Sequence, residues 1–141
     1  MQQQLDEPPS EQSEEVPQPY DENHLQRVFA VPDSWWGFKA VGREGHPGAC
    51  VQELPATREW ILLKGTGAED RTKYYPTESV IAPTDENGLS KLTVFSLKPR
   101  PERGRRLNNL VRDPKRVMGV LSLDELQQLR SQMIRQFGLR G

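Results

Sequence analysis

Two short apolar runs separated by five residues are the feature that most restricts the fold of this chain. Ala49–Leu54 and Trp60–Lys64 are rich in apolar residues, and the segment between them, Pro55–Glu59, has the length of a hairpin loop. We therefore expect an antiparallel β hairpin over residues 49–64. Cys50 lies inside the first of these runs, which predicts a small core residue rather than a nucleophile.

Other short apolar runs, bounded by glycine, proline or polar turn residues, predict four further strands. They are Trp36–Val41, Ser79–Ala82, Lys91–Lys98 and Val117–Leu121. Within residues 91–98 the alternation predicts that Leu92 and Val94, with Ser96, share one face. Since neighbouring residues of a strand point to opposite faces, one of Trp35 and Trp36 is expected to fill the core, and the other to stack on a base or cover a dimer seam.

The end of the chain carries a clear helix pattern over residues 122–137. Ser122 is a candidate N-cap, Glu125 stands at the capping-box spacing, and Gly138 supplies a stop. Apolar residues recur at helical spacing at Leu123, Leu126, Leu129, Met133, Ile134 and Phe137. One helix packed on about five short strands predicts a mainly β, α+β fold: a small β-barrel or rolled sheet with a C-terminal helix.

Charge divides the 141-residue chain into two unequal parts. Residues 1–24 hold seven acidic residues, four prolines and no lysine or arginine, which predicts a disordered acidic tail. Residues 25–141 carry 19 basic and 13 acidic residues, a net charge of +6, and we expect them to form a single basic domain. Such a domain suits a polyanionic partner. The tail either competes with that partner or serves only to keep the protein soluble.

The remaining composition indicates a cytoplasmic protein. Cys50 is the single cysteine, which excludes an internal disulfide and fits a reducing compartment. No apolar run approaches the roughly 20 residues of a membrane-spanning helix, so no membrane association is expected. No His/Cys spacing suggests zinc, and we expect neither a metal nor another cofactor.

The candidate catalytic residues lie at the two ends of the predicted hairpin. Arg43, Glu44 and His46 lie in a glycine-rich turn before it, and Lys64 and Thr66 lie at the end of its second strand. If the strand ends meet, His46 can serve as acid or base, Lys64 and Arg43 can supply positive charge, and Thr66 can donate a hydrogen bond. Glu44 can orient His46 or share its role. The alternative is that His46 and Thr66 are turn residues, and that Arg43 and Glu44 form a solvated pair.

A second functional signal is the segment Lys98–Arg116, with eight basic and two acidic residues. We expect it either to contact RNA phosphates or to be a solvated, mobile loop. Asn108 and Asn109 would be available to base edges. The residues expected to bind RNA are Lys64, Trp36, Arg100, Arg103, Arg105 and Arg106.

The order of these pieces resembles the MazF/PemK family of toxins from type II toxin–antitoxin systems. The matching segments read GREGHPGACV, WILLKGTG, NGLSKLTVFSL, RRLNNL and VMGVLSLDELQQLRSQMIRQFGL, within about residues 35–139. The resemblance implies an SH3-like barrel, a homodimer, metal-independent cleavage of single-stranded RNA, and an antitoxin peptide that occupies the RNA groove.

The resemblance also indicates which residues carry the chemistry. Family members use an Arg before the proline and a Thr or Ser at the end of the third strand. Thr66 matches the second residue, whereas His46 stands where the Arg is expected, and Lys64-Gly65 replaces the usual proline. Two functions follow: an endoribonuclease toxin, or a catalytically inactive RNA- or protein-binding module of the same fold. A peptide-reading SH3-like adaptor is a weaker third alternative.

Overall fold

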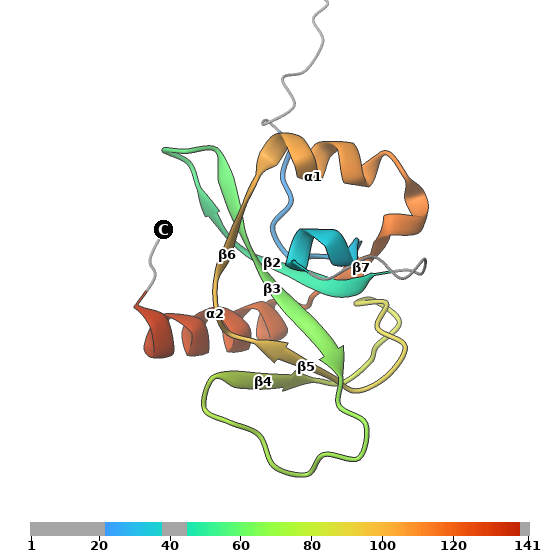
Figure 1. Ribbon diagram of the computed structural model, residues 1–141, viewed down its shortest axis with the longest axis vertical. Helices are drawn as coiled ribbons and strands as arrows, with labels where there is room; N and C mark the ends of the chain where they lie inside the picture. Colours follow the sequence, from blue (N-terminus) through green and yellow to red (C-terminus); the bar gives the residue numbers. More distant parts are fainter. Residues whose placement is uncertain (1–21, 38–44, 139–141) are drawn as a thin grey trace, which may run out of the picture.

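Antiparallel strands make up most of the computed structural model, which describes residues 22–37 and 45–138 (Figure 1). The described elements are β1 (Arg27–Val31), η2 (Asp33–Trp36), β2 (His46–Leu54), β3 (Glu59–Gly67), β4 (Glu78–Ile81), β5 (Thr93–Ser96), β6 (Arg100–Arg103), α1 (Gly104–Val111), η3 (Pro114–Arg116), β7 (Val117–Val120) and α2 (Leu123–Phe137), where η denotes a 3-10 helix. The fold is therefore mainly β and of the α+β class, as the sequence predicts, but it has two α-helices where the sequence analysis expects one.

The seven strands form one sheet in the order β4-β5-β3-β2-β1-β7, with β6 added beside β3. Strand β3 organises this sheet because it has different partners along its length. Its first six residues pair with β2, the first four of these also pair with β6, and its last three residues pair with β5. Within the described residues no pairing joins the edge strands β4 and β7, so the expected closure into a barrel is not found.

The predicted hairpin is confirmed as β2 and β3. Leu54 pairs with Glu59 next to the turn, and Gly48 pairs with Lys64 near the open end. A register shift between Cys50 and Gln52 marks a bulge, which increases the local twist. Cys50 is fully buried, and burial raises the pKa of its thiol, in agreement with a core role.

Alternating residues of the hairpin enter two separate cores. Ile61 and Leu63 pack with Leu126, Leu129 and Met133 of α2. The other core surrounds Trp60 and Leu62 and includes the following side chains: Phe29, Val31, Trp36, Cys50, Leu107 and Leu110. The helices α1 and α2 thus cover opposite faces of β3, because its successive side chains point in opposite directions.

Helix α2 begins and ends where the sequence predicts. The Ser122 hydroxyl accepts from the Glu125 N–H at 3.0 Å, and the Ser122 N–H donates to the Glu125 carboxylate at 2.8 Å, which completes the capping box. Gly138 closes the helix with a φ of 73°. Two residues of the expected apolar stripe are exposed, Leu123 and Phe137, because they lie at the two ends of the helix.

The prediction of a strand that begins at Trp36 is wrong. Trp36 instead ends the 3-10 helix η2, and Gly37 follows in the left-handed region at φ 90°. Residues 38–41 of that expected strand lie outside the described residues. A strand that the sequence analysis did not predict, β1, pairs with both β2 and β7. Leu92 lies just before β5 and is 40% exposed, whereas Val94 and its neighbour Phe95, both within β5, are buried.

The interpretation of Lys98–Arg116 as a loop is also wrong. This segment contains β6, α1 and η3. Its apolar residues Leu107 and Leu110 are buried against the core around Trp60, which holds the helix in place although most of its other side chains are polar.

The folded part begins before residue 25, because His24 is fully buried. Its imidazole lies in edge contact with Trp60 at 5.5 Å between ring centroids, and Nε2 lies 2.6 Å from Oδ1 of Asn108. Residues 1–21 of the expected tail lie outside the described residues. No helix in the described part of the chain has the length and apolarity needed to cross a membrane.

Candidate functional site

His46 and Thr66 line the same cleft, as the sequence analysis expects from the meeting of two strand ends. Gly48 on β2 pairs with Lys64 on β3, and His46 and Thr66 lie two residues beyond this pair toward the open end of the hairpin. The cleft has a volume of about 720 Å³. Its walls therefore bring together an imidazole and a hydroxyl from adjacent strands.

A carboxylate holds His46 in position. Oδ1 of Asp33 lies 2.6 Å from Nδ1 of His46, and the side chains are 14% and 33% exposed, respectively. A carboxylate on one ring nitrogen fixes the orientation of the imidazole and selects the tautomer with a proton on that nitrogen. Nε2 is then the atom suited to exchange a proton with a substrate.

The sequence analysis missed Asp33. This residue begins η2, directly after Pro32, which follows β1 and stands at the N-cap position of η2. The available signal was an acidic residue after an apolar run, but nothing local indicated that it would face His46. The two residues are brought together by the pairing of Val31 in β1 with His46 in β2.

Close packing of backbone shapes the entry to the site. A Cβ atom built on Gly45 would lie 1.5 Å from the carbonyl oxygen of Val31. Only glycine permits this approach of the two chain segments, and the approach places the next residue, His46, at the start of β2.

Lys64 lies on β3 within electrostatic reach of Asp33 and Arg100. Partial burial lowers the pKa of Lys64, the Asp33 carboxylate opposes this decrease, and the Arg100 guanidinium adds to it. A lysine in such surroundings gives up a proton more readily than an exposed one. Asp33 therefore connects His46 with a partly desolvated ammonium group.

Further basic side chains of the cleft are Lys91 and Lys115. Lys115 belongs to the basic segment 98–116, whereas Lys91 was not singled out as a candidate. Lys91 lies 3.4 Å from the Glu69 carboxylate, which also lines the cleft. Arg43 and Glu44 lie outside the described residues.

The residues expected to bind RNA separate into two groups. Arg100 donates to the Trp35 carbonyl at 3.2 Å and lies over the Trp36 ring at 5.2 Å, while Arg106 lies over the Trp35 ring at 3.8 Å. Arg100 and Arg106 therefore both contact η2. Arg103 and Arg105 instead line a separate hollow of about 430 Å³, at the start of α1.

Two side chains cannot take the roles that the sequence analysis gave them. Asn108 is only 5% exposed and bonded to His24, so it is not available to a base; Asn109 is exposed. Trp36 is 7% exposed and packs over Gly48, where a Cβ atom would lie 3.3 Å from the ring. Trp36 is therefore a core residue, and the partly exposed Trp35 is the one that reaches the surface.

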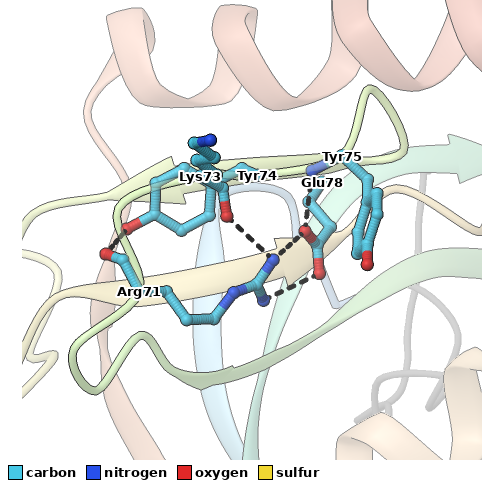
Figure 2. Close-up of polar contacts among 5 residues, drawn as sticks. All are labelled: Arg71, Lys73, Tyr74, Tyr75 and Glu78. Atoms are coloured by element: carbon cyan, nitrogen blue, oxygen red, sulfur yellow. Dashed lines mark hydrogen bonds and ion pairs between the residues drawn. The ribbon is translucent and has the colours of Figure 1, made fainter.

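The connection from β3 to β4 is held by one arginine (Figure 2). Arg71 binds both carboxylate oxygens of Glu78, at 2.6 and 3.0 Å, and lies 5.0 Å from the ring centroid of Tyr74. The hydrogen bonds from Arg71 lower the pKa of Glu78. The neighbouring Tyr75 is 70% exposed, so this ordered loop presents an aromatic ring to solvent.

Among the described side chains, no group of three or more His, Cys, Asp or Glu is arranged to hold a metal ion. No protein-family model matches the chain, and no curated protein matches it. The site must therefore be interpreted from its own geometry.

Proposed function

We propose that this protein is a MazF/PemK-like endoribonuclease that cleaves single-stranded RNA without a metal ion. The observation that carries this proposal is that His46, which is paired with Asp33, lines a cleft together with Thr66. Lys91 and Lys115 in the cleft walls suit the phosphates of RNA, because cationic side chains provide most of the affinity for such a polyanion.

The proposed chemistry uses two side chains of the cleft, His46 and Thr66, together with Lys64, which lies two residues before Thr66 on β3. His46 Nε2 takes the proton of the ribose 2′-OH, and O2′ attacks the adjacent phosphorus. The bond from phosphorus to O5′ breaks, and the Lys64 ammonium, with its lowered pKa, supplies the proton to O5′. The Thr66 hydroxyl donates to a phosphoryl oxygen as negative charge builds up there. The products are a 2′,3′-cyclic phosphate and a free 5′-OH.

A second candidate is an RNA-binding module of the same fold without catalysis. The observation in its favour is that His46 stands where the resembling enzymes have an Arg. An imidazole differs from a guanidinium in charge and in length, so the chemical step would depend on Asp33, the partner of His46.

The decisive experiment is incubation of the full chain with a long single-stranded RNA in EDTA. We expect cleavage by the wild type and its loss in His46→Ala and Thr66→Ala. Ser131→Ala is the matched control, since Ser131 lies on α2 and its hydroxyl bonds only to carbonyls of its own helix. RNA binding without cleavage would favour the module, and absence of both would contradict both candidates.

The proposal includes two protein partners, a second copy of this chain and an acidic antitoxin peptide. Lysines in the cleft walls would attract acidic side chains as they would phosphates. Light scattering would test the dimer. Competition between RNA and the product of a neighbouring acidic reading frame would test the antitoxin, and simultaneous binding of both would contradict a shared groove.

A further inference from the structure

The 3-10 helix η2 connects the candidate catalytic pair with a stack of aromatic and basic side chains. Asp33 at its start holds His46, and Trp35, two residues later, contacts Arg106 of α1. In Figure 1, η2 and α1 lie next to each other at one end of the molecule, and β4 and β5 lie at the other end. Because a 3-10 helix rises only about 2 Å per residue, the backbones of Asp33 and Trp35 lie close together along η2, although their side chains point to different sides of it.

Arg106 is held against the face of the Trp35 ring. Its Cζ atom lies 3.8 Å from the ring centroid, and Nη1 donates to Glu102 at 3.0 Å. At this distance the guanidinium is in van der Waals contact with the indole face. The Arg106 side chain is nevertheless 47% exposed, so the contact with Trp35 leaves a large part of it accessible to solvent.

Trp35 is fixed from its backbone as well. Arg100 donates to the Trp35 carbonyl at 3.2 Å and also lies over Trp36. Arg100 also contributes to the lowered pKa of Lys64, so Arg100 links Trp35 and Trp36 electrostatically with the candidate site. The Trp35–Arg106 pair is therefore preorganised, since its geometry does not have to be established by a ligand.

We propose that the Trp35–Arg106 stack is a nucleobase subsite, in which one unpaired base of single-stranded RNA lies against the exposed side of the Arg106 guanidinium. This inference rests on the proposed function, because it assumes that RNA occupies the neighbouring cleft. Arginine planes and aromatic rings are the surfaces on which proteins stack unpaired bases. A contact with a phosphate would need only the positive charge of Arg106. Contact with the face of the Trp35 ring also restricts how the planar guanidinium is oriented, and a stacked base needs such an oriented surface.

The test separates stacking from charge with Arg106→Lys, which keeps the charge and loses the plane. It uses the full chain carrying His46→Ala, so that RNA stays intact. The two probes are a short oligoadenylate and inorganic polyphosphate, a polyanion without bases. Arg135→Lys is the matched control, because Arg135 is an exposed arginine of the other helix, α2, and is not among the residues expected to bind RNA.

For oligoadenylate we expect Arg106→Lys to weaken binding by about five- to tenfold, within the range for loss of one stacked base. Binding of polyphosphate should change less than about twofold, because Arg106→Lys keeps the positive charge. Arg135→Lys should bind both probes as the parent protein does. Circular dichroism and melting temperature of Arg106→Lys establish that the fold is retained.

If Arg106→Lys weakened binding of both probes equally, Arg106 would make only a charge contact. If it left the affinity for oligoadenylate unchanged, no base would stack on Arg106. Either result overturns the inference. Failure of the parent to bind oligoadenylate would overturn it as well. Cleavage in EDTA is measured independently on the protein with His46 intact, so loss of the catalytic proposal and loss of the subsite give different results.

Discussion

Oδ1 of Asp33 lies 2.6 Å from Nδ1 of His46, although the two residues are 13 positions apart in the sequence. The pairing of β1 with β2 creates this contact. It gives His46 a defined orientation in the cleft and distinguishes it from a histidine that merely occupies a turn.

Asp33→Asn is expected to reduce the rate constant for RNA cleavage by about 10²-fold or more, because general acid–base catalysis contributes this much and the amide no longer stabilises a charged imidazole. The measurement is single-turnover cleavage of an RNA in EDTA, with affinity determined separately. Ser34→Ala, at the next and exposed position of η2, should cleave like the wild type. Unchanged cleavage by Asp33→Asn would exclude a role for the pair.

Gly45→Ala is expected to destabilise the protein, since the new Cβ atom would lie 1.5 Å from the Val31 carbonyl oxygen and the strands must separate. The free energy of unfolding should fall by about 1–3 kcal/mol or more, as for overpacking elsewhere. Urea denaturation measures this loss. A Gly45→Ala protein with the wild-type denaturation midpoint would show that β1 and β2 separate without cost.

The buried His24 makes stability sensitive to acid. Burial, the largest cause, lowers the pKa of His24 from 6.5, whereas the unfolded chain titrates at the ordinary value. The unfolded state therefore binds more protons as the pH falls below about 6.5, so stability is complete above this pH and is lost below it. Urea midpoints measured between pH 7.5 and 5 should show this decrease.

The control for this pH dependence is His24→Gln, which can still donate to Asn108 but does not titrate near neutral pH. Its midpoint should change less between pH 7.5 and 5 than that of the wild type. Parallel curves for the two proteins would assign the acid sensitivity to other groups.

Asn87 joins the loop before β5 to helix α2. Its side chain is fully buried; Oδ1 accepts from the N–H groups of Thr84 and Leu89, and Nδ2 donates to the Ala82 carbonyl and the Glu125 carboxylate. Asn87→Ala leaves these groups without a partner and should lower the free energy of unfolding by about 1–3 kcal/mol.

Thermal and urea denaturation test the Asn87 prediction, with Asn109→Ala as the control at an exposed position. Because Leu89 also lines the cleft, RNA affinity of Asn87→Ala should fall together with stability. Equal stability of the two asparagine variants would contradict a structural role for Asn87.

Local sequence patterns were sufficient for the elements whose stabilising contacts lie close together in the chain. The capping box of α2 joins residues three apart, and the β2–β3 turn joins strands four residues apart, so both were predictable. Helix α1 was not predicted, because its arginines and asparagines conceal the two leucines that anchor it. Its stability depends on burial of Leu107 and Leu110 in a core assembled from distant segments.

The sequence by itself determined the candidates His46 and Thr66, the basic character of the chain beyond residue 24, and the helix and hairpin. Only the tertiary structure decided that Asp33 holds His46 and that Trp35, rather than Trp36, contacts the exposed Arg106. Contacts of this kind depend on which strands pair and which face each residue occupies. The spacing of apolar residues, with a period of two or 3.6, describes a single strand or helix. It does not indicate which other elements pack against that strand or helix.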